Sequence, residues 1–228
     1  MKTTVMMMMI SALNALAGQA PTAEQIVQRM MEHDQTRQCS LRAYTWTSHY
    51  VLDNKERHAE MMVQWTRQPD GTKRYEVAYE HGDGGIRDHV FHKLLESEVE
   101  ASQPTLQARN RLNDKNYEFR LTGSEEVNGR LAYVLEVEPR TESRYLINGR
   151  VWIDATDFAV VQVEGSPSKR PSFWTNSVGF VQTFEKHGDY WVVASNRSVT
   201  YAKLFGKADL VIKHSNYNFA PAVMIASR

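Results

Sequence analysis

The spacing of apolar and polar residues predicts one helix at the start of the folded part of the chain. Thr22-Ala-Glu-Gln25 has the form of a capping box, in which two side chains and two backbone N–H groups bond reciprocally. The apolar residues behind it follow at helical spacing and are Ile26, Val27, Met30 and Met31. We therefore expect an amphipathic helix over about residues 23 to 36.

From Tyr44 onward the hydrophobic period changes to two, which is typical of strands with one buried face. Polar or glycine-containing turns such as Pro69-Asp-Gly71 and Val127-Asn-Gly129 separate the alternating segments. The expected strands contain Tyr44 to Tyr50, Met61 to Trp65, Tyr75 to Tyr79, Tyr117 to Leu121 and Leu131 to Val137, and then run over about 143–154, 158–165, 177–186, 190–204 and 208–219. The pattern predicts a mainly β (α+β) protein with an antiparallel meander of about ten strands.

Between about residues 88 and 113 the two-residue period disappears. Val90, Phe91, Leu94, Leu95 and Val99 share one helical face, and Pro104 separates this helix from a second, short one. The preceding Gly82-Asp-Gly-Gly85 is expected to be a flexible loop. We interpret the segment as a helical lid inserted between strands.

One face of the predicted sheet is aromatic or aliphatic and the other is charged, so the apolar face must be covered. The helices supply few large apolar side chains for so long a sheet. Either the sheet curls on itself, or part of its concave face binds an apolar ligand. The candidates for ligand contact or core packing are Trp46, Tyr50, Trp65, Tyr75, Val77, Tyr79, Phe91, Leu94, Leu95, Phe119, Leu121, Tyr133, Leu135 and Val137.

Residues 1–20 are expected to form a cleaved signal peptide. Lys2 is followed by an apolar stretch from Val5 to Ala17 and then by small and polar residues, with cleavage after Ala17 or Ala20. The stretch is too short to cross a bilayer as a helix, so we expect a periplasmic protein without a permanent membrane span. The equal numbers of basic and acidic residues, 27 each, argue against nucleic acid as a partner.

No local pattern indicates catalysis. Cys39 is the only cysteine and cannot form an intramolecular disulfide. His89 and His92 are spaced like metal ligands on a helix, but a surface pair is the commoner outcome, and Asp154 and Asp157 flank a turn. We predict a protein that is not an enzyme and needs no metal or cofactor.

A basic, aromatic loop is formed by Lys169-Arg-Pro171 with Phe173-Trp174. It either contacts lipid headgroups or a partner, or is a solvated loop.

Three segments together resemble a known family. They are Val127–Pro139, Gly149-Arg-Val-Trp-Ile-Asp154 and Phe158–Gly165. They are similar to outer-membrane lipoprotein-sorting, LolA-like proteins and to the amino-terminal domain of RseB/MucB-type periplasmic sensors. The resemblance implies a single half-barrel domain over residues 21–228, with an incomplete, half-open barrel whose concave side takes acyl chains. It carries over no individual functional residue.

The resemblance leads to a periplasmic carrier or chaperone for the acyl chains of lipoproteins or of other lipids. The alternative is an envelope-stress or regulatory sensor that binds a lipid signal and a membrane partner. A third hypothesis is an enzyme that uses the region of His89 and His92. The chain ends about where the first domain of RseB-like proteins ends, and we expect this to favour the carrier.

Overall fold

A computed structural model describes residues 20–40, 43–169, 175–202 and 206–219. The predicted signal peptide, apart from Ala20, lies outside the described residues, as do residues 170–174 of the basic, aromatic loop and the side chain of Cys39. Among the described residues, no helix has the length and apolar character needed to traverse a membrane.

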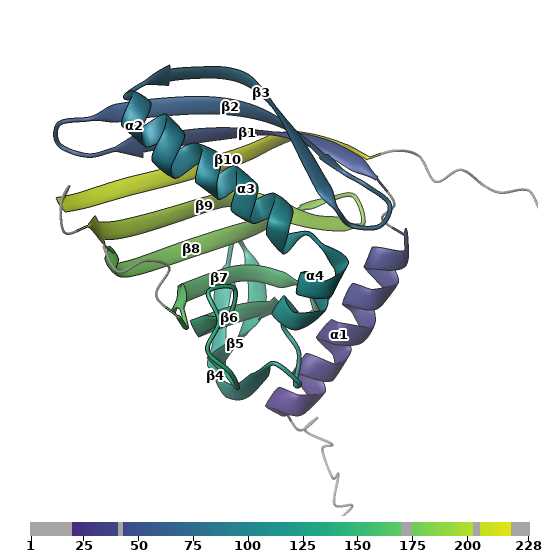
Figure 1. Cartoon of the computed structure of the whole chain (residues 1–228). Helices are drawn as coiled ribbons and strands as arrows, with labels where there is room; N and C mark the ends of the chain where they lie inside the picture. Colours follow the sequence, from purple (N-terminus) through teal and green to yellow (C-terminus); the bar gives the residue numbers. More distant parts are fainter. Residues whose placement is uncertain (1–19, 41–42, 170–174, 203–205, 220–228) are drawn as a thin grey trace, which may run out of the picture.

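The described chain contains helices, a π-helical turn and strands (Figure 1). In chain order they are α1 (Ala23–Ser40), β1 (Tyr44–Asp53), β2 (His58–Arg67), β3 (Lys73–Gly82), α2 (Gly84–Ile86), the π-helical turn η1 (Arg87–Phe91), α3 (His92–Ala101), α4 (Pro104–Asn110), β4 (Tyr117–Val127), β5 (Arg130–Pro139), β6 (Ile147–Asp154), β7 (Val160–Pro167), β8 (Thr175–His187), β9 (Tyr190–Ala202) and β10 (Gly206–Phe219).

All strands belong to one antiparallel sheet in the order β3-β2-β1-β10-β9-β8-β7-β6-β5-β4. The first and last strands of the chain pair with each other, from Tyr44 opposite Phe219 to Asp53 opposite Asp209. The edges are β3 and β4, which are consecutive in the sequence, and the sheet is not closed. The helical insertion therefore connects the two free edges and lies over the sheet (Figure 1). This confirms the mainly β fold with an N-terminal helix and an inserted helical segment.

Helix α1 begins with the predicted capping box. The Thr22 N–H donates to Gln25 Oε1 at 3.0 Å, and the Gln25 N–H donates to Thr22 Oγ1 at 3.3 Å. The helix continues to Ser40, four residues beyond the expected end. Ile26, Val27 and Met30 are buried as predicted, but Met31 is 37% exposed and lies outside the buried face.

The expected glycine loop before the insertion is instead the start of a helix. Asp83 Oδ1 accepts a hydrogen bond from the Ile86 N–H at 2.9 Å, so Asp83 is the N-cap and Gly84 and Gly85 lie in the first helical turn. The prediction of a flexible Gly82–Gly85 loop is wrong, because Gly82 ends β3 and the Asp83 side chain caps a helix that starts at Gly84. The insertion begins at Gly84 rather than near residue 88.

A β-bulge moves Tyr79 to the face opposite the one expected. Met62 pairs with Tyr79 and Val63 pairs with Val77, so Ala78 is the extra residue. Tyr75 and Val77 remain on the helix-covered face, whereas Tyr79 is 48% exposed and its hydroxyl donates to Glu60.

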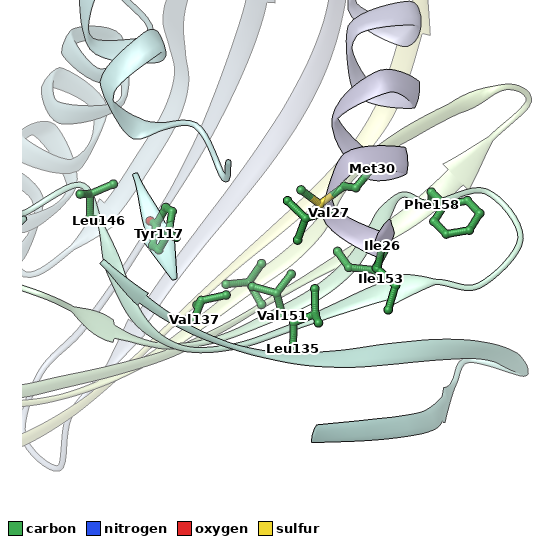
Figure 2. Packing of buried hydrophobic residues seen from close by; sticks show 11 residues of the cluster. Ile26, Val27, Met30, Tyr117, Leu135, Val137, Leu146, Val151, Ile153 and Phe158 are labelled. Atoms are coloured by element: carbon green, nitrogen blue, oxygen red, sulfur yellow. The ribbon is translucent and has the colours of Figure 1, made fainter. Parts of the chain in front are cut away.

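Buried apolar side chains form two main clusters on the helix side of the sheet. In the first, α1 packs Ile26, Val27 and Met30 against β5 to β7 (Figure 2). In the second, Ile86, Phe91 and Leu95 of the insertion cover β1 and β2. A smaller third cluster is formed by Ala132, Val134, Trp152 and Val161. Ala132 and Val134 alternate with Tyr133 and Leu135, so the expectation that the other face is only polar and charged is wrong for this part of the sheet.

Two glycines hold β6 and β7 close together. Gly149 pairs with Gly165, and a Cβ on Gly149 would overlap the carbonyl oxygen of Glu164. We expect Gly149→Ala to lower the free energy of unfolding by about 1–3 kcal/mol, because the strands must separate. Gly179→Ala is the matched control, since a Cβ on Gly179 meets no atom within 4 Å. Equal denaturant midpoints for the two variants would contradict the expected close approach.

Candidate functional site

The second cluster contains most of the predicted ligand-contacting residues of β1 to β3 and of the insertion. Trp46, Tyr50, Trp65, Phe91 and Leu95 are buried in it, and Tyr75 and Val77 are half-buried against it. The indole rings of Trp46 and Trp65 stack with their centroids 5.7 Å apart. Leu94 is half-buried on α3. These side chains pack against one another in the structure.

The first cluster collects the remaining predicted residues. Leu135 and Val137 are fully buried, while Phe119, Leu121 and Tyr133 are half-buried against the same core. The structure therefore places the fourteen candidates in two separate groups, with Leu94 on the insertion and Tyr79 on the opposite face. Their contact with a ligand stays a prediction.

A polar row that the sequence analysis missed crosses β1, β10 and β9. The buried Ser48 Oγ lies 2.8 Å from His214 Nδ1, and His214 Nε2 lies 3.0 Å from Asn196 Nδ2. Ser48 has the same phase as Trp46 and Tyr50 on β1. His214 has the same phase as Leu210 and Ile212 on β10. The signal available in the sequence was a polar residue at a position where the two-residue alternation calls for an apolar one.

Charged groups of β3 and α3 lie near this row. Lys73 Nζ and Glu98 Oε1 form an ion pair, and the ammonium lowers the pKa of Glu98. Burial lowers the pKa of His214 to about 4; Glu98 raises it in part, and Lys73 lowers it further. His214 is therefore neutral at neutral pH. The Trp46 Nε1–H, which is also buried on this side of β1, has no hydrogen-bond partner among the described residues.

Ion pairs fasten the insertion to the edge strand β3. Glu80 accepts from Arg87 Nη1 at 2.7 Å, and its other oxygen lies 3.1 Å from His92 Nε2. Arg57, at the β1–β2 turn, lies 3.8 Å from Asp83. Half-exposed ion pairs are individually weak, so the insertion is held mainly by its three buried apolar residues.

The two histidines considered as metal ligands do not converge. His92 contacts Glu80, whereas His89 is exposed. Within residues 20–40, 43–169, 175–202 and 206–219, no three histidine, cysteine or carboxylate side chains are grouped as a metal site requires.

Asp154 and Asp157 stabilise a turn. The buried Asp154 carboxylate accepts from the backbone N–H groups of Thr156 and Asp157 and from Arg130 Nε at 2.5 Å. Burial raises the pKa of Asp154, but the guanidinium and the backbone donors outweigh burial and hold the pKa below its usual value. Arg37 of α1 donates to the Asp157 carbonyl oxygen at 2.5 Å, which attaches the end of the helix to this turn.

A cavity of about 870 Å³ lies between α1 and β4. Its apolar lining includes Val27, Met30, Met31, Leu112, Tyr117, Phe119 and Val160. Phe119 is the one member of the predicted ligand set that lines it. The sequence could not indicate this cavity, because α1 and β4 are about eighty residues apart and only the fold brings them together.

The buried His214 predicts a pH dependence of stability. Its pKa of about 4 in the folded protein is below the ordinary value of about 6.5, so the unfolded chain takes up the proton first as pH falls. The free energy of unfolding should therefore decrease between about pH 6.5 and 4, by at most about 3 kcal/mol. In His214→Gln this part of the decrease should vanish, as denaturant unfolding at several pH values can show. His58→Gln, at an exposed position, is the control, and an unchanged pH profile in His214→Gln would contradict the assignment.

Comparison with known proteins identifies a family. Residues 49–164 match the MucB/RseB N-terminal domain, and residues 112–217 match a family of unknown function, DUF5686. A search of curated protein sequences gave no match.

The solved structures that match this chain have low sequence identity to it. A DUF1329 family protein from Desulfovibrio piger has a TM-score of 0.47 and 16% identity over 90% of this chain and 95% of that chain. A LolA superfamily protein from Nitrosomonas europaea has a TM-score of 0.47 and 11% identity over 88% and 94%. A MucA/MucB complex of Pseudomonas aeruginosa has a TM-score of 0.27 and 14% identity over 84% and 93%. Since the match to the MucB/RseB N-terminal domain spans half of the sequence, the chain belongs to that family.

Proposed function

We propose that the protein is a non-catalytic binding protein of the bacterial periplasm that takes up the acyl chain of a lipoprotein or of another lipid. The observation that supports this best is the second cluster, where an aromatic sheet face is covered by a helical insertion rather than by a second sheet. Only Ile86, Phe91 and Leu95 of the insertion are buried there. An acyl chain would replace these three side chains when the insertion moves away.

The energetics suit reversible binding. Each methylene removed from water contributes about 0.8 kcal/mol, so a partly covered acyl chain is enough for useful affinity. Opening the insertion exposes its three apolar side chains, and this cost is offset by the ligand. A carrier needs such a balance, because cargo that is fully enclosed cannot be released. In this proposal residues 21–228 act as one half-barrel unit.

A second candidate is an envelope sensor, which family membership favours. MucB has been solved in complex with MucA(peri). In this function the same apolar face would bind a lipid signal, and a membrane protein would be the partner. Both candidates require acyl-chain binding; a carrier then hands over its cargo, whereas a sensor changes its affinity for the membrane partner.

Weakening the attachment of the insertion should increase its opening. Glu80→Gln removes the carboxylate that binds both Arg87 and His92, so we expect amide hydrogen exchange over residues 84–101 to become roughly two- to fivefold faster. Glu118→Gln breaks one ion pair, to Arg140, that includes no residue of 84–101, and serves as control. Added palmitate should slow exchange over the same residues. Equal exchange with and without palmitate would identify a fixed core helix.

A photo-crosslinking side chain on the insertion can detect the ligand directly. At the half-buried Leu94 it should capture the lipid retained by protein purified from the periplasm without detergent, whereas at the neighbouring exposed Lys93 it should not. Intact mass spectrometry of each variant measures the adduct. Capture at neither position, together with lipid-free native mass spectra, would exclude the acyl-binding function.

A further inference from the structure

The cavity between α1 and β4 has the form of a groove along the helix. Its helical lining runs from Glu24 to Arg37, which corresponds to about 20 Å at 1.5 Å per residue. The opposite wall consists of the start of β4, from Tyr117 to Phe119, with residues 111–114 before it. Met31, one of the exposed large apolar side chains of the protein, lies in this groove.

The β4 wall is a free sheet edge. The Arg140 N–H donates to the Asn116 carbonyl oxygen at 2.8 Å, which marks this pair as hydrogen-bonded. Because bonded and non-bonded pairs alternate along an antiparallel ladder, Phe119 opposite Val137 and Leu121 opposite Leu135 are non-bonded pairs. The backbone N–H and C=O groups of Phe119 and Leu121 therefore point away from β5, toward the outer edge of the sheet.

The groove has an excess of negative charge. Five carboxylates and three guanidinium groups line it. Arg140 pairs with Glu118 at 2.8 Å, and the field of Arg37 and Arg111 acts on Asp34. The remaining carboxylates are Glu24, Glu32 and Asp114, and none of the ion pairs among the described residues includes them. A ligand with positive charges would compensate them.

We propose that this groove binds an extended, basic peptide segment of a partner protein, which adds as a strand to the edge of β4 opposite α1. Six extended residues span about 20 Å, which equals the length of the helical wall. Alternate side chains of the peptide would contact the apolar floor around Val27, Met31 and Phe119 and the carboxylates at the rim. An acyl chain would fit the floor but would leave the backbone groups of β4 and the carboxylates without partners.

The test uses blocked hexapeptides and the full mature chain. An acetylated and amidated peptide of alternating lysine and valine should bind and shift the amide resonances of residues 24–37 and 111–121. The glutamate–valine counterpart should bind at least tenfold more weakly. So should a lysine–valine peptide with alternate N-methylated amides, because it cannot pair with the edge of β4. Isothermal titration calorimetry gives the affinities.

Charge variants assign the site. Glu24→Lys combined with Glu32→Lys should weaken lysine–valine binding at least tenfold, because both exposed carboxylates line the groove. Glu56→Lys makes a single change of the same kind in the exposed β1–β2 turn and should leave the affinity unchanged. Circular dichroism confirms the fold of each variant.

Several results would overturn the inference. Absence of binding of the lysine–valine peptide would contradict the site. So would equal affinities of the lysine–valine and glutamate–valine peptides, or an undiminished affinity of the N-methylated peptide. Resonance shifts outside residues 24–37 and 111–121 would also contradict it. Displacement of the peptide by palmitate, with palmitate shifts at residues 24–37, would assign the groove to a lipid instead. Palmitate shifts confined to residues 84–101 belong to the separate acyl-binding surface and leave the peptide site intact.

Discussion

The structure depends on covering the apolar face of a sheet that does not close. The two edge strands, β3 and β4, are consecutive in the chain, so the chain must cross the sheet to pass from one edge to the other. The insertion makes this crossing and buries Ile86, Phe91 and Leu95 on the way. Helix α1 covers the other half. The hydrophobic effect thus determines the position of the helices.

The concave face is divided rather than uniform. A polar row of Ser48, His214 and Asn196 crosses β1, β10 and β9, with the Lys73–Glu98 pair nearby. The two apolar clusters lie in different halves of the sheet. Buried polar groups are costly unless they are paired, and both ring nitrogens of His214 have a partner, one on each neighbouring strand. Ser48 lies between Trp46 and Tyr50 on β1, so this polar row runs through the second cluster and interrupts its apolar surface.

Sequence periodicity was sufficient for the fold class, for the capping box at Thr22 and for the Asp154 turn, because each depends on residues close together in the chain. One error was local, since Asp83 caps a helix where a loop was expected. The others arose where tertiary pairing altered a local rule. The bulge at Ala78 is invisible to an alternation pattern and reversed the face of Tyr79. The candidate pocket residues were identified correctly as apolar and inward-facing in most strands, but their division into two packed clusters depends on where α1 and the insertion lie. The groove along α1 was beyond prediction for the same reason.

The pairing of β1 with β10 has a consequence for the order of folding. Tyr44 and Phe219 are neighbours in the sheet but are separated by almost the whole folded chain. During synthesis, β1 can pair with β2 at once, whereas its other edge stays open until the last strand emerges. Contacts of such long range slow folding and leave an aromatic strand edge exposed in the meantime. Truncation before β10 would therefore leave the backbone groups on one edge of β1 permanently unpaired. A chain shortened in this way should aggregate rather than fold as a stable domain.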